Sequence, residues 1–158
     1  MDDRKFRNAM GKFATGVTVI TTEVDGEQHG MTANAFMSVS LNPKLVAVSI
    51  GEKAHMLEKI NKSKKYAVNI LAADQQNLSM IFAGQIKERQ DIAFDTLDGL
   101  PVIKGVLAQI ICEVVSVHVE GDHSLFIGKV TNVHLEEHEP LLFSNGKYRS
   151  LLAGEENS

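Results

Sequence analysis

The sequence has little of several features that mark specialised classes of protein. Its single cysteine, Cys112, cannot form an internal disulfide, which excludes a scaffold built on disulfides and favours a reducing compartment such as the cytoplasm. The N-terminus lacks the apolar core of a signal peptide, and no apolar run approaches the roughly 20 residues that span a bilayer. We therefore expect a soluble cytoplasmic protein that makes no contact with a membrane.

Excess basic charge is also lacking. The chain has 16 basic and 20 acidic residues, which gives a net charge of −4 and no electrostatic footprint for a phosphate backbone. The one dense basic stretch, residues 59–65, follows a predicted helix, where basic side chains are favoured by the helix dipole. We expect no nucleic acid as a partner.

Familiar cofactor and metal motifs are missing as well. The chain contains no Gly-x-Gly-x-x-Gly after a strand and no Gly-x-x-x-x-Gly-Lys-Ser/Thr, so any nucleotide is held in another way. A metal site would depend on His134 and His138. Their four-residue spacing converges on one ligand only in a helix, and Pro140 follows closely, so no metal site is expected.

Nucleophilic catalysis has weak support. Cys112 lies in an apolar run without a nearby cation, which favours a small buried side chain over a reactive thiol. Asp122, His123 and Ser124 are the residue types of a hydrolase triad, but neighbours in the chain cannot all converge on one proton path. His123 remains a candidate functional ring in the turn after Gly121, and a solvated turn histidine is the alternative.

The composition indicates one globular domain. The chain has 158 residues, of which 44% are hydrophobic and 23% charged, so it can bury a sizeable core. We place a single domain at residues 1–152 and a C-terminal tail at residues 153–158. No linker or internal repeat divides the chain.

The pattern of apolar residues predicts many strands and a few short helices. A helix capped by Asp2 or Asp3 is expected to end near Gly16, and a second helix is expected over residues 54–60. A third begins at Asp74 as cap and ends at Gly84, and residues 85–98 form a surface excursion. The expected strands span residues 17–24, 28–36, 45–50, 66–71, 107–120, 124–135 and 141–143.

Six or seven strands without alternating βαβ units predict a mainly β fold, a small β-barrel with short helices. A barrel of this size fills its own interior, so a ligand must bind against a strand face, a helix end or a second subunit. A homodimer is the simplest way to complete such a site.

Residues 30–43 form the most informative segment. Small residues stand where a strand would carry bulky ones, and Thr32, Asn34, Ser38 and Ser40 offer polar groups at a two-residue spacing. This pattern is typical of a backbone that lies against a flat polar ligand. A half-exposed strand ending in a turn at Asn42-Pro43 is the alternative.

An ordered set of motifs spans most of the chain and consists of the following residues: Phe6, Arg7, Met10, 13–17, 30–36, 38–40, Pro43, 82–84, 121–123 and 146–148. This set resembles the flavin reductase family with the Greek-key FMN-binding split-barrel fold. Within that family, the sequence is similar to the small reductase components of two-component phenol and 4-hydroxyphenylacetate hydroxylases.

The resemblance implies a role for each part of this motif set. The isoalloxazine ring of the flavin would lie along Met31, Thr32, Ala33, Asn34, Ala35 and Phe36. The phosphate side would be held by Ser38, Val39, Ser40, Ser49, Ile50, Lys53 and Ala54. The flavin would be covered by Phe82, Ala83 and Gly84, with Tyr148 and the catalytic His123 on the nicotinamide side. Tyr148 has an alternative role, which is to cover the end of the barrel.

The implied activity is an NAD(P)H-dependent flavin reductase that prefers NADH and FAD, with NADPH and FMN left open. Hydride transfer between stacked rings requires positioning rather than a catalytic acid or base. The implied partner is a separate flavin-dependent aromatic monooxygenase that receives the reduced flavin. A flavin-binding storage or electron-relay protein is the main alternative. An oxidase on the same barrel is a third possibility, but it would carry more basic residues around its phosphate.

Overall fold

The computed structural model describes residues 1–84 and 92–151. Its largest element is a seven-stranded sheet in which every pair of neighbouring strands is antiparallel, with the order β3-β2-β6-β9-β10-β5-β4. Its strands are β2 (Thr18–Val24), β3 (Glu27–Ala33), β4 (Phe36–Ser40), β5 (Leu45–Gly51), β6 (Lys65–Ile70), β9 (Ala108–Glu120) and β10 (His123–Leu135).

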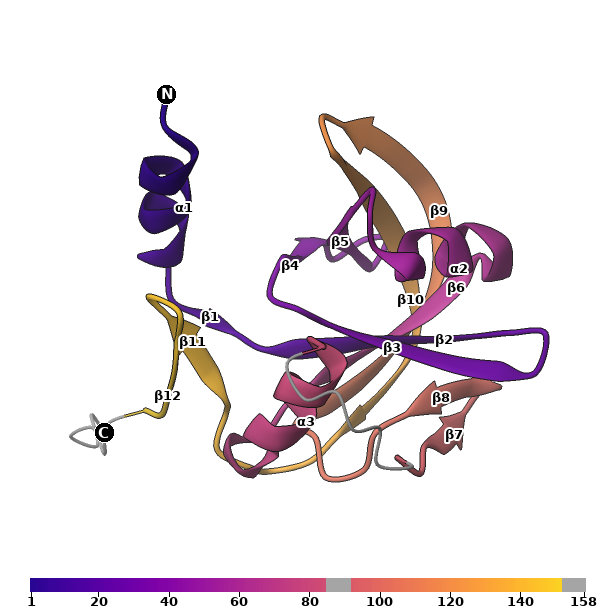
Figure 1. Cartoon of the computed structure of the whole chain (residues 1–158). Helices are drawn as coiled ribbons and strands as arrows, with labels where there is room; N and C mark the ends of the chain where they lie inside the picture. The colour runs from indigo at the N-terminus through magenta and orange to yellow at the C-terminus, as the bar shows by residue number, and fades with distance from the viewer. Residues whose placement is uncertain (85–91, 152–158) are drawn as a thin grey trace.

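The two edges of this sheet meet at one corner. β3 and β4 are the edge strands, yet only Asn34 and Ala35 separate them in the chain. A connector this short spans about 10 Å at most. The sheet therefore curls on itself (Figure 1), which confirms the predicted mainly β barrel with short helices.

This corner corrects one predicted element. Residues 28–36 were expected to form one strand, but β3 ends at Ala33 and β4 begins at Phe36. The break is needed because the chain leaves one edge of the sheet and enters the other at this point. The polar segment 30–43 is thus divided between two strands and the connector.

The interior of the barrel is apolar and is covered at one end by α2 (His55–Ser63) (Figure 1). Met56 and Ile60 of α2 are buried, and Leu57 packs partly against the same core, as their spacing predicted. The fully buried side chains of this core include Ile20, Val48, Ile50, Tyr66, Val68 and Phe126.

The two ends of the described chain form an arm beside the barrel (Figure 1). It consists of α1 (Asp3–Gly11) and a small sheet of β1 (Thr15–Gly16), β11 (Leu142–Ser144) and β12 (Lys147–Arg149). Asp2 caps α1 by accepting a hydrogen bond from the backbone N–H of Arg4. The helix stops at Gly11 rather than near Gly16, because Thr15 and Gly16 pair with β11 in extended conformation.

The face of the sheet that points away from the barrel interior is covered by η1 (Ala73–Gln75), α3 (Gln76–Phe82) and the hairpin of β7 (Asp95–Leu97) and β8 (Leu100–Val102). The prediction that Asp74 caps the helix was wrong. The backbone N–H of Ala72 instead donates to the side chain of Gln75, 2.9 Å away, so the chain enters the helix through a 3₁₀ turn.

The predicted surface excursion at residues 85–98 was also partly wrong. Residues 85–91 lie outside the described part of the chain, but Asp95–Leu97 pairs with β8 across a turn at Asp98 and Gly99. Leu97 and Phe94 each pack against a buried apolar cluster. The predicted C-terminal tail at 153–158 also lies outside the described residues. Among the described helices, none is both long and apolar enough to cross a bilayer.

Candidate functional site

Side chains alternate along β3, so the predicted flavin strand has two different faces. Met31 and Ala33 pack against the barrel core beside Ile20. Gly30 and Thr32 point to the other face, where α3 lies. The β3 residues that were predicted to line one face of a ligand therefore lie in two places: Met31 and Ala33 at the barrel interior, and Thr32 at the contact with α3.

The space left by the missing side chain of Gly30 is filled by another residue of the protein. A Cβ atom on Gly30 would lie 2.6 Å from Cε1 of Phe82, so the aromatic ring occupies the space of the missing side chain. The ring of Phe82 also contacts that of Phe94, with centroids 5.8 Å apart. Phe82 is thus seated on β3, which places Ala83 and Gly84 at the end of α3 beside it.

A chain of hydrogen bonds ties the same face to the arm. The hydroxyl of Thr32 donates to the backbone carbonyl of Ser79 at 2.6 Å, and the hydroxyls of Ser79 and Tyr148 are 2.8 Å apart. Tyr148 also packs edge-on against Phe143 at 5.2 Å. Thr32, Phe82 and Tyr148 therefore form one group around α3, and the side chain of Tyr148 links the arm to the barrel.

Several exposed residues of the polar segment 30–43 lie in the connector between β3 and β4 and in β4 itself. Asn34, Ala35 and Ser38 are exposed, whereas Phe36 packs against the core. Val39 lies at an irregularity in the pairing between Ser38 and Ser40 and is 46% exposed. The backbone N–H of Ser49 donates to the carbonyl of Ala35 at 3.0 Å, which fixes the corner to β5.

The end of β5 and the start of α2 offer donors for an anion. Ala54 is the N-cap of α2 and supplies no side-chain cap, so the N–H groups of the first turn have no side-chain acceptor there. Lys53 and Ser49 lie on the same segment, and neither side chain forms a hydrogen bond with another described residue. Ile50 is fully buried, so only its backbone can contact a ligand.

His123 is held at the tip of the β9–β10 hairpin. It is the first residue of β10 rather than a turn residue, and it pairs with Gly51 of β5 and Glu120 of β9. Its Nδ1 atom is 2.8 Å from Oδ1 of Asp122. The backbone N–H of Glu52 donates to the carbonyl of Asp122 at 2.9 Å, which ties the tip to the start of α2.

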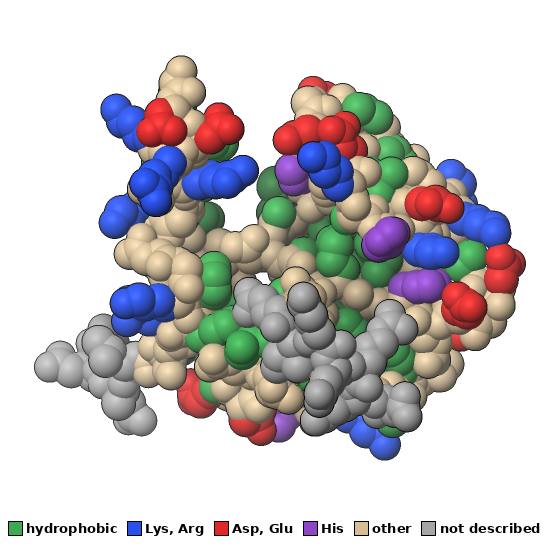
Figure 2. All heavy atoms as spheres, viewed as in Figure 1, with side chains coloured by type: hydrophobic (Ala, Val, Ile, Leu, Met, Phe, Trp, Pro, Cys, Tyr) green, Lys and Arg blue, Asp and Glu red, His purple; other side chains and the backbone are tan. Residues whose placement is uncertain are grey.

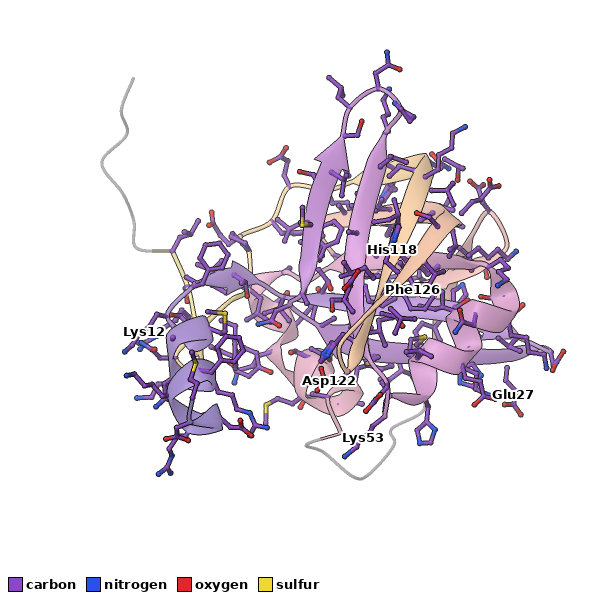
Figure 3. All side chains as sticks on the ribbon, turned by 90° about the horizontal axis from the view of Figure 1, so that it is seen from above. Lys12, Glu27, Lys53, His118, Asp122 and Phe126 are labelled. Carbon is purple, nitrogen blue, oxygen red and sulfur yellow. The ribbon has the colours of Figure 1, made fainter. Side chains whose placement is uncertain are left out.

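The neighbouring side chains at this tip favour the ionised form of Asp122. The hydrogen bond from His123, and more weakly the charge of Lys53, lower the pKa of Asp122 below its ordinary value. Asp122 and Lys53 lie near each other on one side of the molecule (Figure 3). The ring of His123 is 49% exposed, so it is accessible to a ligand.

The predicted site residues thus form two groups within one chain. The group of Ser49, Lys53, Ala54 and His123 lies around the hairpin tip, which is at the top of Figure 1, and the group around α3 is towards the bottom. Residues 34–40 run between them on the barrel wall. An open notch separates the barrel from α1 on the same side (Figure 2).

The other candidates from the sequence are not part of this site. Cys112 is fully buried, and burial raises the pKa of its thiol to about 12, which confirms the prediction of an inert core residue. His134 and His138 lie 3.2 and 3.3 Å from the two oxygens of Glu136, although no helix is present. Within the described residues, no cluster of three or more His, Cys, Asp or Glu side chains could hold a metal. A groove of about 410 Å³ includes His134 and Glu136 but none of the predicted site residues.

Comparison with known proteins identifies the family. The model of the flavin reductase like domain matches residues 10–152. The chain is 45% identical to an NADH-dependent flavin reductase of Rhodococcus over 148 residues, which covers 92% of this chain and 84% of that protein. The chain belongs to the flavin reductase-like family.

Two further relatives agree with this assignment. This flavin reductase is 38% identical over 148 residues to the reductase component of 4-hydroxyphenylacetate 3-monooxygenase from Thermus thermophilus, covering 93% of this chain and 95% of that protein. It is 69% identical to flavin reductase PheA2, whose solved structure superposes with a TM-score of 0.95 over 96% of this chain and 99% of that chain. The resemblance stated from the motifs is confirmed.

The residues of this flavin reductase suit an anionic flavin. Lys53, Ser49 and the uncapped start of α2 are the donor types that a phosphate requires. Two residues of the site were not predicted from the sequence: Ser79, which joins Thr32 to Tyr148, and Gly51, which lies beneath the ring of His123. No local pattern identified either residue, because each matters through a contact with a distant element.

Proposed function

We propose that this flavin reductase oxidises NADH, reduces FAD or FMN, and supplies the reduced flavin to a separate flavin-dependent monooxygenase. The observation that carries this proposal is the similarity along almost the whole chain to reductases of this activity, including a component of a two-component monooxygenase. The donor groups at the start of α2 support it, because both the flavin and the nicotinamide coenzyme are anionic.

The residues of the barrel wall have a positioning role in this proposal. Ser49, Lys53 and the first turn of α2 bind the phosphate of the flavin, and residues 34–40 lie along its ring system. When bound, the flavin supplies the ring nitrogen that accepts the hydride. Backbone N–H groups along a strand of small residues can stabilise the negative charge that develops on the reduced ring. The ring of Phe82, seated on Gly30, bounds the site at α3.

The nicotinamide side is assigned to His123, with Tyr148 as the second candidate. His123 is held by Asp122 and remains half exposed at the hairpin tip, so it can contact a bound coenzyme. Tyr148 of β12 is fixed by Ser79 of α3 and by Phe143, and both β12 and α3 lie away from that tip (Figure 1). His123 belongs to the group at the hairpin tip, and Tyr148 belongs to the group around α3. Both residues can border one flavin only if another protein surface completes the site between these groups.

A second copy of the chain supplies that surface in our proposal. α1 has no buried residue, and its apolar side chains Phe6 and Met10 are 52% and 57% exposed, with Phe13 just beyond at 79%. Exposed apolar side chains of β4 and the following turn add Met37 and Leu41. Large apolar side chains are thus exposed on α1 and on the barrel wall, on the two sides of the notch. A homodimer would cover them and complete the site beside the notch.

The partner protein is inferred from the relatives, and the location of this flavin reductase from the chemistry of its substrates. The named relatives include the reductase component of an aromatic hydroxylase, which supports an aromatic, phenol-type monooxygenase as the acceptor of reduced flavin. Because reduced flavin and NADH are both produced in reducing surroundings, we place the protein in the cytoplasm. Its single buried thiol is compatible with that compartment.

The activity is tested by mixing the purified protein with NADH and FAD and following the loss of NADH, with and without oxygen. Oxidation of NADH that depends on flavin is expected. FMN and NADPH replace FAD and NADH in parallel reactions and rank the substrates by kcat/KM. Binding of flavin without oxidation of either coenzyme would instead identify a storage or electron-relay protein and would contradict the proposed reductase.

A further inference from the structure

The hydrogen bond between Asp122 and His123 defines which ring nitrogen carries the proton. A lowered pKa keeps Asp122 ionised at neutral pH, and an ionised carboxylate only accepts hydrogen bonds. The Nδ1 atom of His123, 2.8 Å from Oδ1 of Asp122, must therefore be the donor. When the ring is neutral, Nε2 then bears the lone pair and is an acceptor.

The Nε2 atom lies over the backbone of Gly51. A Cβ atom built on Gly51 would be 3.6 Å from Nε2 and 3.7 Å from Cε1, which is van der Waals contact, so the ring edge lies directly beside this position. The charge of Lys53 acts on Asp122, and Glu120 is the residue opposite His123 on β9. Since the partner of the ring is Asp122 at Nδ1, Nε2 can accept a hydrogen bond from a ligand that reaches the tip.

We propose that Asp122 is a positioning residue that holds His123 in the Nδ1–H tautomer, so that Nε2 accepts a hydrogen bond from the carboxamide N–H of the nicotinamide. This inference rests on the proposed role of His123 on the nicotinamide side. The carboxamide is the polar group of the nicotinamide ring, and a fixed acceptor would set the rotation of that ring over the flavin. The flavin itself makes no use of this acceptor.

The first test is Asp122→Asn, which keeps the size of the side chain. An amide can accept from Nδ1–H or donate to Nδ1, so the tautomer is no longer imposed. We expect KM for NADH to rise about three- to tenfold, the effect of losing one neutral hydrogen bond, while the dissociation constant of the flavin stays unchanged. Asp25→Asn is the matched control, because Asp25 also lies in a hairpin turn and pairs with Lys62 at 2.8 Å.

The second test removes the donor from the coenzyme. The reduced 3-acetylpyridine analogue of NADH carries a methyl group in place of the carboxamide NH₂. For the wild-type protein, we expect the ratio of KM for the analogue to KM for NADH to be several-fold higher than for Asp122→Asn or His123→Ala. Comparing ratios between variants cancels the different intrinsic reactivity of the analogue.

The third test reads the tautomer without any turnover. Long-range ¹H–¹⁵N spectra distinguish an Nδ1–H from an Nε2–H imidazole, and His123→Ala assigns the signal among the six histidines. We expect the Nδ1–H form in the wild-type protein and in Asp25→Asn. Asp122→Asn should show a mixture or the Nε2–H form.

The outcomes separate this inference from the proposed function. If His123→Ala leaves KM for NADH unchanged while flavin-dependent oxidation persists, the proposed role of His123 fails and the inference fails with it. If His123→Ala weakens NADH binding but Asp122→Asn matches the wild-type protein in KM and tautomer, only the inference is overturned. Loss of the analogue effect in both variants, with unchanged flavin binding, supports it.

Discussion

Two glycines of this flavin reductase are small because another side chain fills the space of the missing one. The ring of Phe82 lies on Gly30, and the hydroxyl end of Tyr66 lies on Gly128. Neither glycine has a positive φ, so close approach rather than turn geometry requires them. At the residue scale, the absence of a side chain therefore positions a ring, and the ring of Phe82 belongs to the proposed site.

Gly128 is the position where this packing has the clearest energetic cost. A Cβ atom there would lie 2.5 Å from the hydroxyl of Tyr66 and 2.8 Å from Cβ of Cys112, both within the core. We expect Gly128→Ala to reduce the free energy of unfolding by about 1–3 kcal/mol through overpacking. Urea denaturation measures the change. Gly16→Ala, with no atom within 4 Å of the new Cβ, is the control, and equal stability of the two variants would contradict the expectation.

Ala35 tests whether a ligand lies along the connector. Its side chain is exposed, whereas Ala33 packs against the core, so only a change at Ala35 isolates ligand binding from folding. We expect Ala35→Leu to weaken flavin binding at least about tenfold at an unchanged Tm, because the larger side chain occupies the space of the ring. Titration calorimetry with flavin measures the effect. Ala93→Leu, also exposed, should bind flavin like the wild-type protein; matching affinity in Ala35→Leu would exclude this contact.

At the element scale, α1 receives little support from the described residues of its own chain. It is nine residues long, and helices of that length are marginal in water without tertiary packing. None of its residues is buried, although Phe6 and Met10 form an apolar stripe. Figure 2 shows the helix standing apart from the barrel. The proposed dimer accounts for an otherwise unsupported element.

A charge on this stripe should therefore separate the subunits. We expect Met10→Asp to convert the dimer to a monomer, because burying a carboxylate at an apolar interface without a partner costs several kcal/mol. Size-exclusion chromatography with light scattering measures the mass at micromolar concentration. Asn8→Asp lies on the opposite side of the helix and should remain a dimer. A monomeric wild-type protein would contradict the proposed interface.

At the scale of the whole molecule, charge is divided unevenly between the arm and the barrel. The arm is basic, with Asp2 and Asp3 as its acids against Arg4, Lys5, Arg7, Lys12, Lys147 and Arg149. Since the net charge of the chain is −4, the rest of the protein is acidic. The basic arm of one copy and the acidic barrel of another are electrostatically complementary, which adds support for the dimer.

Exposed carboxyl groups paired with basic side chains contribute to the response of the fold to acid. Lys62 lowers the pKa of Asp25 below 3.8, and His138 with His134 lowers that of Glu136 below 4.5. Groups with a lowered pKa stabilise the fold above the unfolded value and lose that effect as pH falls through the folded value. We expect Tm to be nearly constant from neutral pH to about 5 and to fall below about 4.5.

Thermal denaturation across this pH range measures the response, with Asp25→Asn as the test variant. Because the amide introduced at this position does not titrate in the acid range, the decrease in Tm between about pH 5 and pH 3 should be smaller in the variant than in the wild-type protein. The effect is small, since the pair with Lys62 is exposed to solvent. An identical decrease in both proteins would show that this pair has no part in the acid response.

Local features account for most of what the sequence could predict. Asp25-Gly26 predicted the first hairpin, and both residues have the positive φ that such a turn requires. Asp98-Gly99 has the same conformation and joins β7 to β8, so the rule that predicted one hairpin could also have predicted the other. The start of α3 was harder to predict, because Gln75 replaces the expected cap through a contact within a 3₁₀ turn.

Turns, alternating strands, family and the residue types available for a site could be predicted from the sequence, because they depend on neighbours in the chain or on motif order. Three features became visible in the folded chain alone: the break of segment 28–36 at the barrel corner, the filling of the space at Gly30 by Phe82, and the position of His123 between Asp122 and Gly51. These arrangements depend on strand register and on closure of the sheet, which bring together residues about 50 to 70 positions apart. No local propensity encodes such contacts.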